Sequence, residues 1–217
     1  MPDVASLYTT NKDLVFKGLG TFVFVADDGA KVPDELFDAD TGEMLPLPDG
    51  WYPVGYTGED GNSHERDRDT AETKSAQEAI NVREDVNMDV QSTKITMLET
   101  SPVSIALYEG LQFTQLGTDL GKPLKWAKPR VPEVVQHPFL FLAVDKSKRT
   151  GAEKVRARLY PAGAITEIGA ATENRSDATG YECTVKAFVD PGFGTDVLNW
   201  MDGPGWRELA GGSAPSS

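Results

Sequence analysis

The feature that most constrains the fold is an alternation of apolar and polar residues with a period of two. In 81–91 (NVREDVNMDVQ) the apolar side chains Val82, Val86, Met88 and Val90 share one parity, and polar residues occupy the other. The segments 154–160 (KVRARLY) and 181–188 (YECTVKAF) alternate in the same way. Such a period is typical of antiparallel strands with one apolar and one polar face.

A single helix interrupts this strand pattern. Ser101-Pro102 is typical of an N-cap followed by proline at the first helical position, and apolar residues spaced three to four apart predict a short amphipathic helix over 102–111. The predicted fold class is mainly β: an antiparallel β-sandwich or barrel-like subunit with one short flanking α-helix and a long irregular loop. We expect a single domain over 1–205, with the loop or arm at 31–81 inside it, and a flexible C-terminal tail at 206–217.

The loop is unusual because it is punctuated by Pro and Gly yet rich in large apolar groups. Proline or glycine recurs throughout 31–62, so no helical period survives there, and long loops in compact domains are usually functional or disordered. Its many apolar residues argue against disorder and require a surface, either the loop's own domain or a neighbour. The charged stretch 62–81 allows a short helix starting from the capping box at 75–78, or an extended segment.

Charge is distributed unevenly along the chain. The formal net charge is −13, with 20 acidic against 7 basic residues in 1–90 and 14 of each in 91–217. This excess excludes a basic nucleic-acid-binding domain. It leaves open whether the acidity serves solubility or a surface along which a polyanion passes without sticking. The single cysteine fits a reducing compartment, and we expect neither a secretory signal nor membrane insertion.

Motifs for chemistry are weak or absent in the sequence. Gly55, Gly58 and Gly61 lack the strand–turn–helix context of a dinucleotide site, and the acidic pair between the last two glycines would repel phosphate. The stretch 38–43 (DADTGE) imitates the start of a calcium loop, but its glycine comes one position early, which favours a surface turn. Two histidines and one cysteine give no zinc spacing. We therefore expect no cofactor, no metal and no enzymatic activity.

The order of motifs resembles a known family. Trp51, Gly55, Tyr56 and Glu59-Asp60-Gly61 form a W-x-x-x-G-Y-x-x-E-D-G element, followed by Gln77 and the strand entry Val82-Arg83-Glu84-Asp85. Over about residues 10–200 the chain resembles the major tail proteins, or tail tube proteins, of bacteriophages with long non-contractile tails, especially those infecting actinobacteria. We expect no additional immunoglobulin-like domain after the core, although some relatives carry one.

The resemblance implies a structural virion protein that assembles in the host cytoplasm. Six subunits would form a ring whose inner strands join into one barrel, and rings would stack into a tube around a tape-measure protein. The tube would also contact tail terminator and distal tail proteins, and double-stranded DNA would pass through it without specific binding. The competing hypotheses are a soluble acidic β-sandwich module that binds carbohydrate or protein, and a small acidic enzyme with an unrecognised site.

Three groups of residues are candidates for these roles. The polar parity of 81–91 could line the lumen or face solvent, and the charges of 64–69 could form inter-subunit ion pairs or a solvated loop. The apolar and acidic residues of the long loop could contact a neighbour. The lumen candidates are Arg83, Asp85, Asn87, Asp89 and Gln91; the loop candidates are Phe37, Leu45, Leu47, Trp51, Tyr52, Tyr56, Glu59 and Asp60; the ion-pair candidates are Glu65, Arg66, Asp67, Arg68 and Asp69.

Overall fold

The computed structural model describes residues 10–27, 29–74, 81–131 and 133–210. The side chains of Lys74 and Val82, including the apolar role expected for Val82, lie outside this description, as does the capping box at 75–78. The regular elements, in chain order, are a 3-10 turn at Lys12–Leu14, β1 (Gly20–Ala26), β2 (Trp51–Pro53), β3 (Ser63–Lys74), β4 (Asn81–Met97), α1 (Pro102–Glu109), α2 (Phe113–Leu116), β5 (Gln136–Lys146), β6 (Glu153–Ile168), β7 (Tyr181–Phe188), β8 (Leu198–Asp202) and α3 (Pro204–Arg207).

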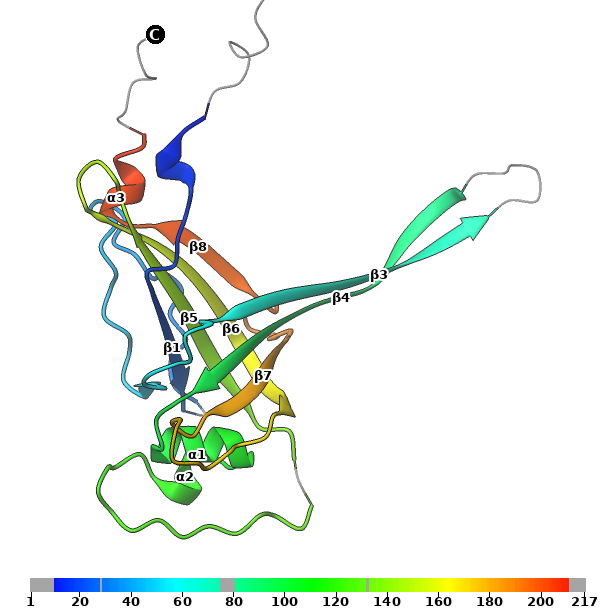
Figure 1. Cartoon of the computed structure of the whole chain (residues 1–217). Helices are drawn as coiled ribbons and strands as arrows, with labels where there is room; N and C mark the ends of the chain where they lie inside the picture. Colours follow the sequence, from blue (N-terminus) through cyan, green and yellow to red (C-terminus); the bar gives the residue numbers. More distant parts are fainter. Residues whose placement is uncertain (1–9, 28, 75–80, 132, 211–217) are drawn as a thin grey trace, which may run out of the picture.

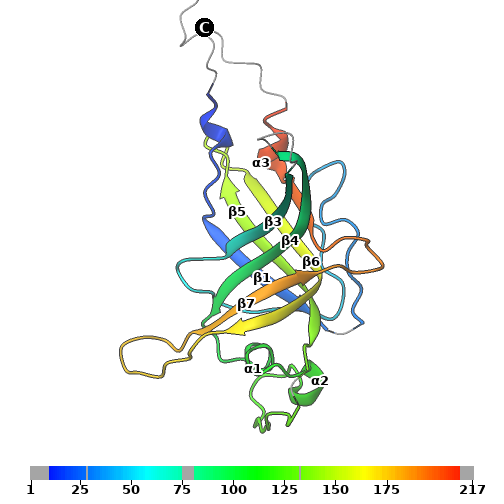
Figure 2. The same cartoon turned by 90° about the vertical axis from the view of Figure 1, so that its right-hand side faces the viewer.

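In the described part of the chain, the eight strands belong to one antiparallel sheet with the order β2-β1-β5-β6-β7-β4-β3, and β8 pairs with the first half of β6. The sheet is strongly twisted and is not closed into a barrel (Figure 2). The helices α1 and α2 lie together at one end of the molecule, and α3 lies at the other (Figure 1). The predicted mainly antiparallel β subunit with a flanking helix is therefore confirmed.

Both faces of the sheet carry a core. On the concave face, Phe139, Phe141 and Tyr160 pack with residues of α1 and α2. On the outer face, Leu140, Leu142 and Leu159 lie under the loop that follows β1. The two clusters use alternate residues of the same strands, as the two-residue period requires.

The predicted helix is confirmed with the expected start. The Ser101 side chain accepts a hydrogen bond from the backbone N–H of Ser104, Pro102 occupies the first turn, and Gly110 ends the helix in a left-handed conformation with φ of 66°. The helix is buried around most of its circumference, from Pro102 to Leu107, because it lies between the sheet and α2.

Two features of the sheet go beyond the sequence pattern. The strand β6 continues past the alternating segment 154–160 to Ile168, and Gly163 lies inside it. A Cβ at Gly163 would come within 2.7 Å of the Phe139 ring, so this glycine serves close packing. The strand β8 was not anticipated from the sequence.

Arg207, beyond the domain boundary expected at residue 205, contacts the rest of the subunit. The Arg207 guanidinium donates to both carboxylate oxygens of Asp202 at 2.7 Å and to the backbone carbonyl of Asp38 at 2.9 Å. The folded body therefore includes at least Arg207 of the segment 206–210. The remainder of the expected tail, 211–217, lies outside the described residues.

A buried ion pair fixes the segment that precedes β1. Lys154 and Asp145 are opposite each other on β6 and β5, and their side chains are 2% and 1% exposed with 2.8 Å between Nζ and Oδ2. The same ammonium donates to the backbone carbonyl of Asp13 at 2.9 Å. The buried charge thus ties the N-terminal segment across the end of the sheet.

Candidate functional site

The outer part of the β3–β4 hairpin is the most prominent feature that the body of the subunit leaves uncovered. It projects far from the sheet (Figure 1), and its described side chains from Glu65 to Thr70 and from Arg83 to Asp89 are all exposed. The strand over 81–91 is confirmed, but the apolar side chains of its alternating pattern are not buried, because Val86 is 56% and Met88 39% exposed. Residues 63–74, expected within the loop, form its partner strand.

A β-bulge at Asn87 exchanges the two faces of β4. Asp69 pairs with Met88, whereas the next residue, Thr70, pairs with Val86, so Asn87 is an extra residue on β4. Cross-strand partners point to the same side of a sheet, and a one-residue shift moves every later side chain to the other face.

The lumen candidates therefore do not share one face, contrary to the alternation in the sequence. Asp89 and Gln91 lie opposite Arg68 and Arg66, whereas Arg83 and Asp85 lie on the reverse side, opposite Thr73 and Ala71. We call the two sides the clamped face and the acidic face. The clamped face carries Arg66, Arg68, Glu84, Val86, Asp89 and Gln91; the acidic face carries Glu65, Asp67, Asp69, Arg83, Asp85 and Met88.

The clamped face is named for an ion-pair cluster within the subunit. The Asp89 carboxylate accepts from Arg66 at 2.6 and 2.7 Å and from Arg68 at 2.5 and 3.0 Å. These two guanidinium groups hold the pKa of Asp89 well below its usual value. Arg66 and Arg68, two of the residues considered for inter-subunit pairs, are thus paired with their own hairpin. The cluster holds the register of two long strands that have no core beneath them.

The long loop rests mainly on its own subunit. Phe37 is 6% exposed within the outer core, Leu47 and Trp51 pack against that core, and Tyr52 packs against the concave core with its ring edge toward Phe113. Phe37 is therefore covered by its own subunit, and contact of the loop candidates with a neighbour stays a prediction. Leu45 remains 39% exposed, and Tyr56 78% exposed.

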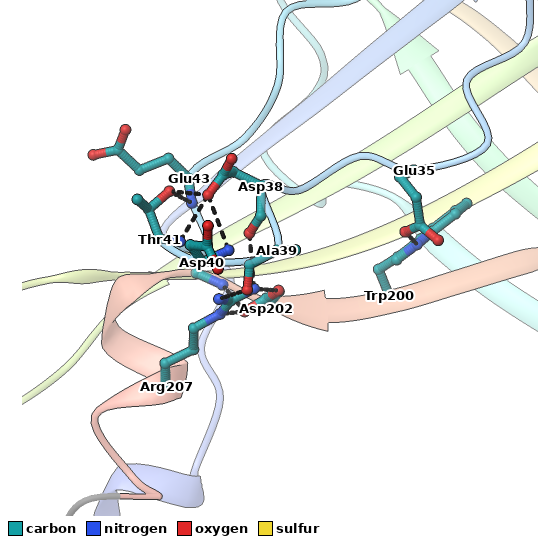
Figure 3. Close-up of polar contacts among 10 residues, drawn as sticks. Glu35, Asp38, Ala39, Asp40, Thr41, Glu43, Trp200, Asp202 and Arg207 are labelled. Atoms are coloured by element: carbon teal, nitrogen blue, oxygen red, sulfur yellow. Dashed lines mark hydrogen bonds and ion pairs between the residues drawn. The ribbon is translucent and has the colours of Figure 1, made fainter.

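Hydrogen bonds fasten the middle of this loop to the C-terminal elements (Figure 3). Arg207 donates to the backbone carbonyls of Asp38 and Ala39, and the Trp200 indole N–H donates to Glu35 at 3.4 Å. The Asp38 carboxylate accepts from the backbone N–H groups of Asp40 and Thr41. The calcium-like stretch is therefore the surface turn that was favoured, with a carboxylate oxygen used by its own backbone.

The W-x-x-x-G-Y-x-x-E-D-G element forms a tight turn seated on Glu99. The Tyr56 backbone N–H donates to the Glu99 carboxylate at 2.8 Å, and Gly58 donates to the Thr96 carbonyl at 2.8 Å. Gly55 has a φ of +91°, and a Cβ there would lie 2.2 Å from the carboxyl carbon of Glu99. The first glycine of the element is therefore required by backbone conformation and by close approach.

Gly55→Ala is expected to lower the free energy of unfolding by about 2–4 kcal/mol, because it adds left-handed strain and displaces the Glu99 carboxylate from the Tyr56 N–H. Urea denaturation of the full chain measures this change. Gly29→Ala is the matched control, since Gly29 has a φ of +79° and open space around it. A loss for Gly55→Ala no larger than the loss of about 1 kcal/mol expected for the control would contradict the role of Glu99.

The same element rims a hollow of about 710 Å³ on the concave face. Its walls include Thr21 of β1, Phe141 of β5, and Arg156 and Arg158 of β6. These arginines occupy the parity of β6 that was expected to face solvent, but that parity points to the concave side, where Tyr160 is fully buried. Sequence periodicity identified the two faces of this strand correctly but did not show that residues of both faces would be buried.

His64 lies at the edge of the hollow. Its ring packs edge-on against Phe141 with 5.7 Å between centroids, and its Nδ1 lies 2.8 Å from the Thr93 hydroxyl, which in turn contacts the Tyr160 hydroxyl at 2.7 Å. Burial, followed by the charges of Arg158 and Arg156, lowers the pKa of His64 to about 4. The histidine is neutral at neutral pH, so the positive charge of this wall belongs to the arginines.

The structure contains little that suggests catalysis or metal binding. Among the described residues, no group of three or more His, Cys, Asp or Glu side chains is placed to hold a metal ion. Cys183 is buried, and desolvation raises the pKa of its thiol to about 12, which disfavours the reactive thiolate. Within the same residues, no helix is long and apolar enough to cross a membrane.

Comparison with known proteins supports an assembly role. A family model described as phage tail tube protein matches residues 8–203 of the chain. A search of the curated proteins found no match. The matched region contains the loop and the two uncovered surfaces described above, the hairpin and the hollow. The chain belongs to the phage tail tube protein family.

Proposed function

We propose that the chain is the subunit of a hexameric ring, and that rings stack into a hollow tube through which genome DNA is delivered. The observation that carries this proposal is the projecting hairpin, whose two faces are both exposed and carry Val86 and Met88. A hairpin of two strands is marginal in water without a surface to cover it. A neighbouring subunit would supply that surface.

The open sheet supports ring formation by a second route. Among the described strands, those at the two ends of the order, β2 and β3, each have a partner on one side only. Natural sheets protect such edges, and closure into a barrel removes them. A cyclic arrangement repeats the same head-to-tail contact around the ring until the first subunit meets the last, so the end strands of neighbouring sheets would protect each other.

The acidic face of the hairpin is the proposed lumen surface. Asp67, Asp69 and Asp85 lie there, with Arg83 bonded to Asp85. An acidic wall would repel phosphates, whereas lysines and arginines would retain DNA by releasing its counterions. Because of the bulge, this proposal keeps Arg83 and Asp85 from the original lumen candidates and moves Asp89 and Gln91 to the contact with a neighbour.

The remaining partners follow from the same role. The tube would enclose a tape-measure protein, end at terminator and distal tail proteins, and assemble in the cytoplasm of the bacterial host. Within this role the subunit acts structurally, not as an enzyme.

Native mass spectrometry of the purified protein over a range of concentrations tests the ring. We expect species that contain six chains and multiples of six, at the expense of the monomer, as the concentration rises. A protein that stays monomeric at every concentration, with and without tail initiation proteins, would contradict the proposal. A dominant ring with another number of chains would contradict the hexamer alone.

A further inference from the structure

The hollow on the concave face has features of an acceptor site, by which we mean a site that receives part of another protein molecule. Arg156 and Arg158 stand two residues apart on one wall, and Arg158 donates to the Asn199 side chain at 3.2 Å. Within the described residues, neither forms an ion pair with a carboxylate. The Asn62 side-chain oxygen, also in the lining, is buried without a hydrogen-bond partner. An occupant would therefore be favoured by a carboxylate at the arginine wall and a donor near Asn62.

The subunit's own hairpin does not fill this hollow. It begins beside the hollow at His64 and then leads away from the body (Figure 1). The hollow and the outer hairpin are therefore two unsatisfied surfaces at different places on one chain. In a cyclic assembly, the outer hairpin of each subunit can lie in the hollow of one neighbour, while its own hollow receives the hairpin of the other neighbour.

The clamped face of the hairpin carries an acidic and an apolar side chain that complement the lining of the hollow. Asp89 is occupied by Arg66 and Arg68, and Asp85, on the other face, by Arg83. Glu84 is exposed and forms no ion pair within the described residues, and it shares its face with the exposed Val86. A carboxylate beside an apolar side chain complements a hollow lined by two arginines and by Phe22 and Tyr56.

We infer that the hollow receives the clamped face of the outer hairpin of a second copy of this chain, with Glu84 against Arg156 and Arg158. This inference rests on the proposed self-assembly and adds the acceptor site to it. The lining also includes Glu59 and Asp60, so the hollow has charge of both signs, which would fix the orientation of the hairpin. The acidic face is then turned away from the acceptor, where it is available to line the lumen.

Site-directed crosslinking of the full chain tests the contact. Val86→Cys and Tyr56→Cys variants are purified separately, mixed under assembly conditions and treated with a short bis-maleimide, while the native Cys183 is shielded because it is 1% exposed. We expect a crosslinked dimer that contains one copy of each variant. Val189→Cys is the control partner for Val86→Cys, since Val189 is 67% exposed but does not line the hollow, and it should give no crosslink.

A charge exchange tests the chemistry of the contact. Arg156→Glu and Glu84→Arg are each expected to raise the concentration needed for assembly by about tenfold or more, because each places like charges together. The variant with both changes should recover to within about threefold of the original protein, because opposite charges again face each other. Arg175→Glu makes the same change of charge on an exposed loop outside the hollow and should assemble normally.

These results separate the inference from the proposed function. If six-fold tubes form but Val86→Cys never crosslinks to Tyr56→Cys, or Arg156→Glu assembles like the original protein, the acceptor site is contradicted and the proposed tube is not. If the unmodified chain never forms rings, both the acceptor site and the proposed tube are contradicted. Circular dichroism of each variant should match the original protein; for a variant that fails to fold, Arg156→Gln replaces Arg156→Glu and should also weaken assembly.

Discussion

Replacing residues 70–87 by Asn-Gly is expected to leave a folded monomer that no longer assembles. The cut falls between Asp69 and Met88, which are cross-strand partners, and Asn-Gly suits a two-residue hairpin turn. The described side chains removed are exposed or half-buried and belong to neither core cluster. The free energy of unfolding should therefore change by no more than about 1 kcal/mol, while rings and tubes disappear because the projecting contact is gone.

Thermal unfolding and native mass spectrometry measure the two halves of this prediction. The matched control replaces only residues 75–80, which come between β3 and β4 in the sequence, by Asn-Gly and keeps both strands. That control should fold and retain at least part of the assembly. A shortened hairpin that still forms six-fold rings would show that the ring contact lies on the body, and loss of folding would show that the hairpin belongs to the core.

Leu36→Ala is expected to lower the free energy of unfolding by about 2–5 kcal/mol, the range for removing a buried leucine side chain. Leu36 is 1% exposed and packs in the outer core beside Phe37, although both lie in a segment without regular structure. A loss of this size approaches the whole stability of many domains. Urea denaturation of the monomer measures it.

Leu45→Ala is the control in the same loop, because Leu45 is 39% exposed. It should change the stability of the monomer by less than about 1 kcal/mol. Equal losses for the two variants would mean that the loop is more uniformly packed than described. A negligible loss of free energy of unfolding for Leu36→Ala would mean that the loop does not stabilise its own subunit and contacts only neighbours.

The contrast between these two leucines shows where sequence reasoning reached its limit. The Pro- and Gly-rich composition identified 31–62 as an irregular segment that needed a surface, and its apolar residues excluded disorder. Composition does not distinguish a surface on the same chain from one on a neighbour. That choice depends on the outer face of β5 and β6, which becomes visible only after the sheet has formed.

The hairpin shows a second limit. The alternation in 81–91 correctly predicted a strand, and the Ser101-Pro102 signal correctly placed the start of α1. The bulge at Asn87 could not be predicted, because an inserted residue is defined by the partner strand and not by the strand that contains it. Residues 65–73 gave no strand signal since neither of their faces meets the subunit's own core, so charges can occupy both parities.

The central claim is that hexameric rings are joined through the projecting hairpin, and cryo-electron microscopy of tubes formed by the purified chain, or of tails on virions, tests it most directly. The account predicts stacked rings with six-fold symmetry, in which the β3–β4 hairpin of each subunit lies on the concave face of the next and the lumen wall carries Asp67, Asp69 and Asp85. A map in which the hairpins point outward into solvent, or in which the ring contains a different number of subunits, would contradict it.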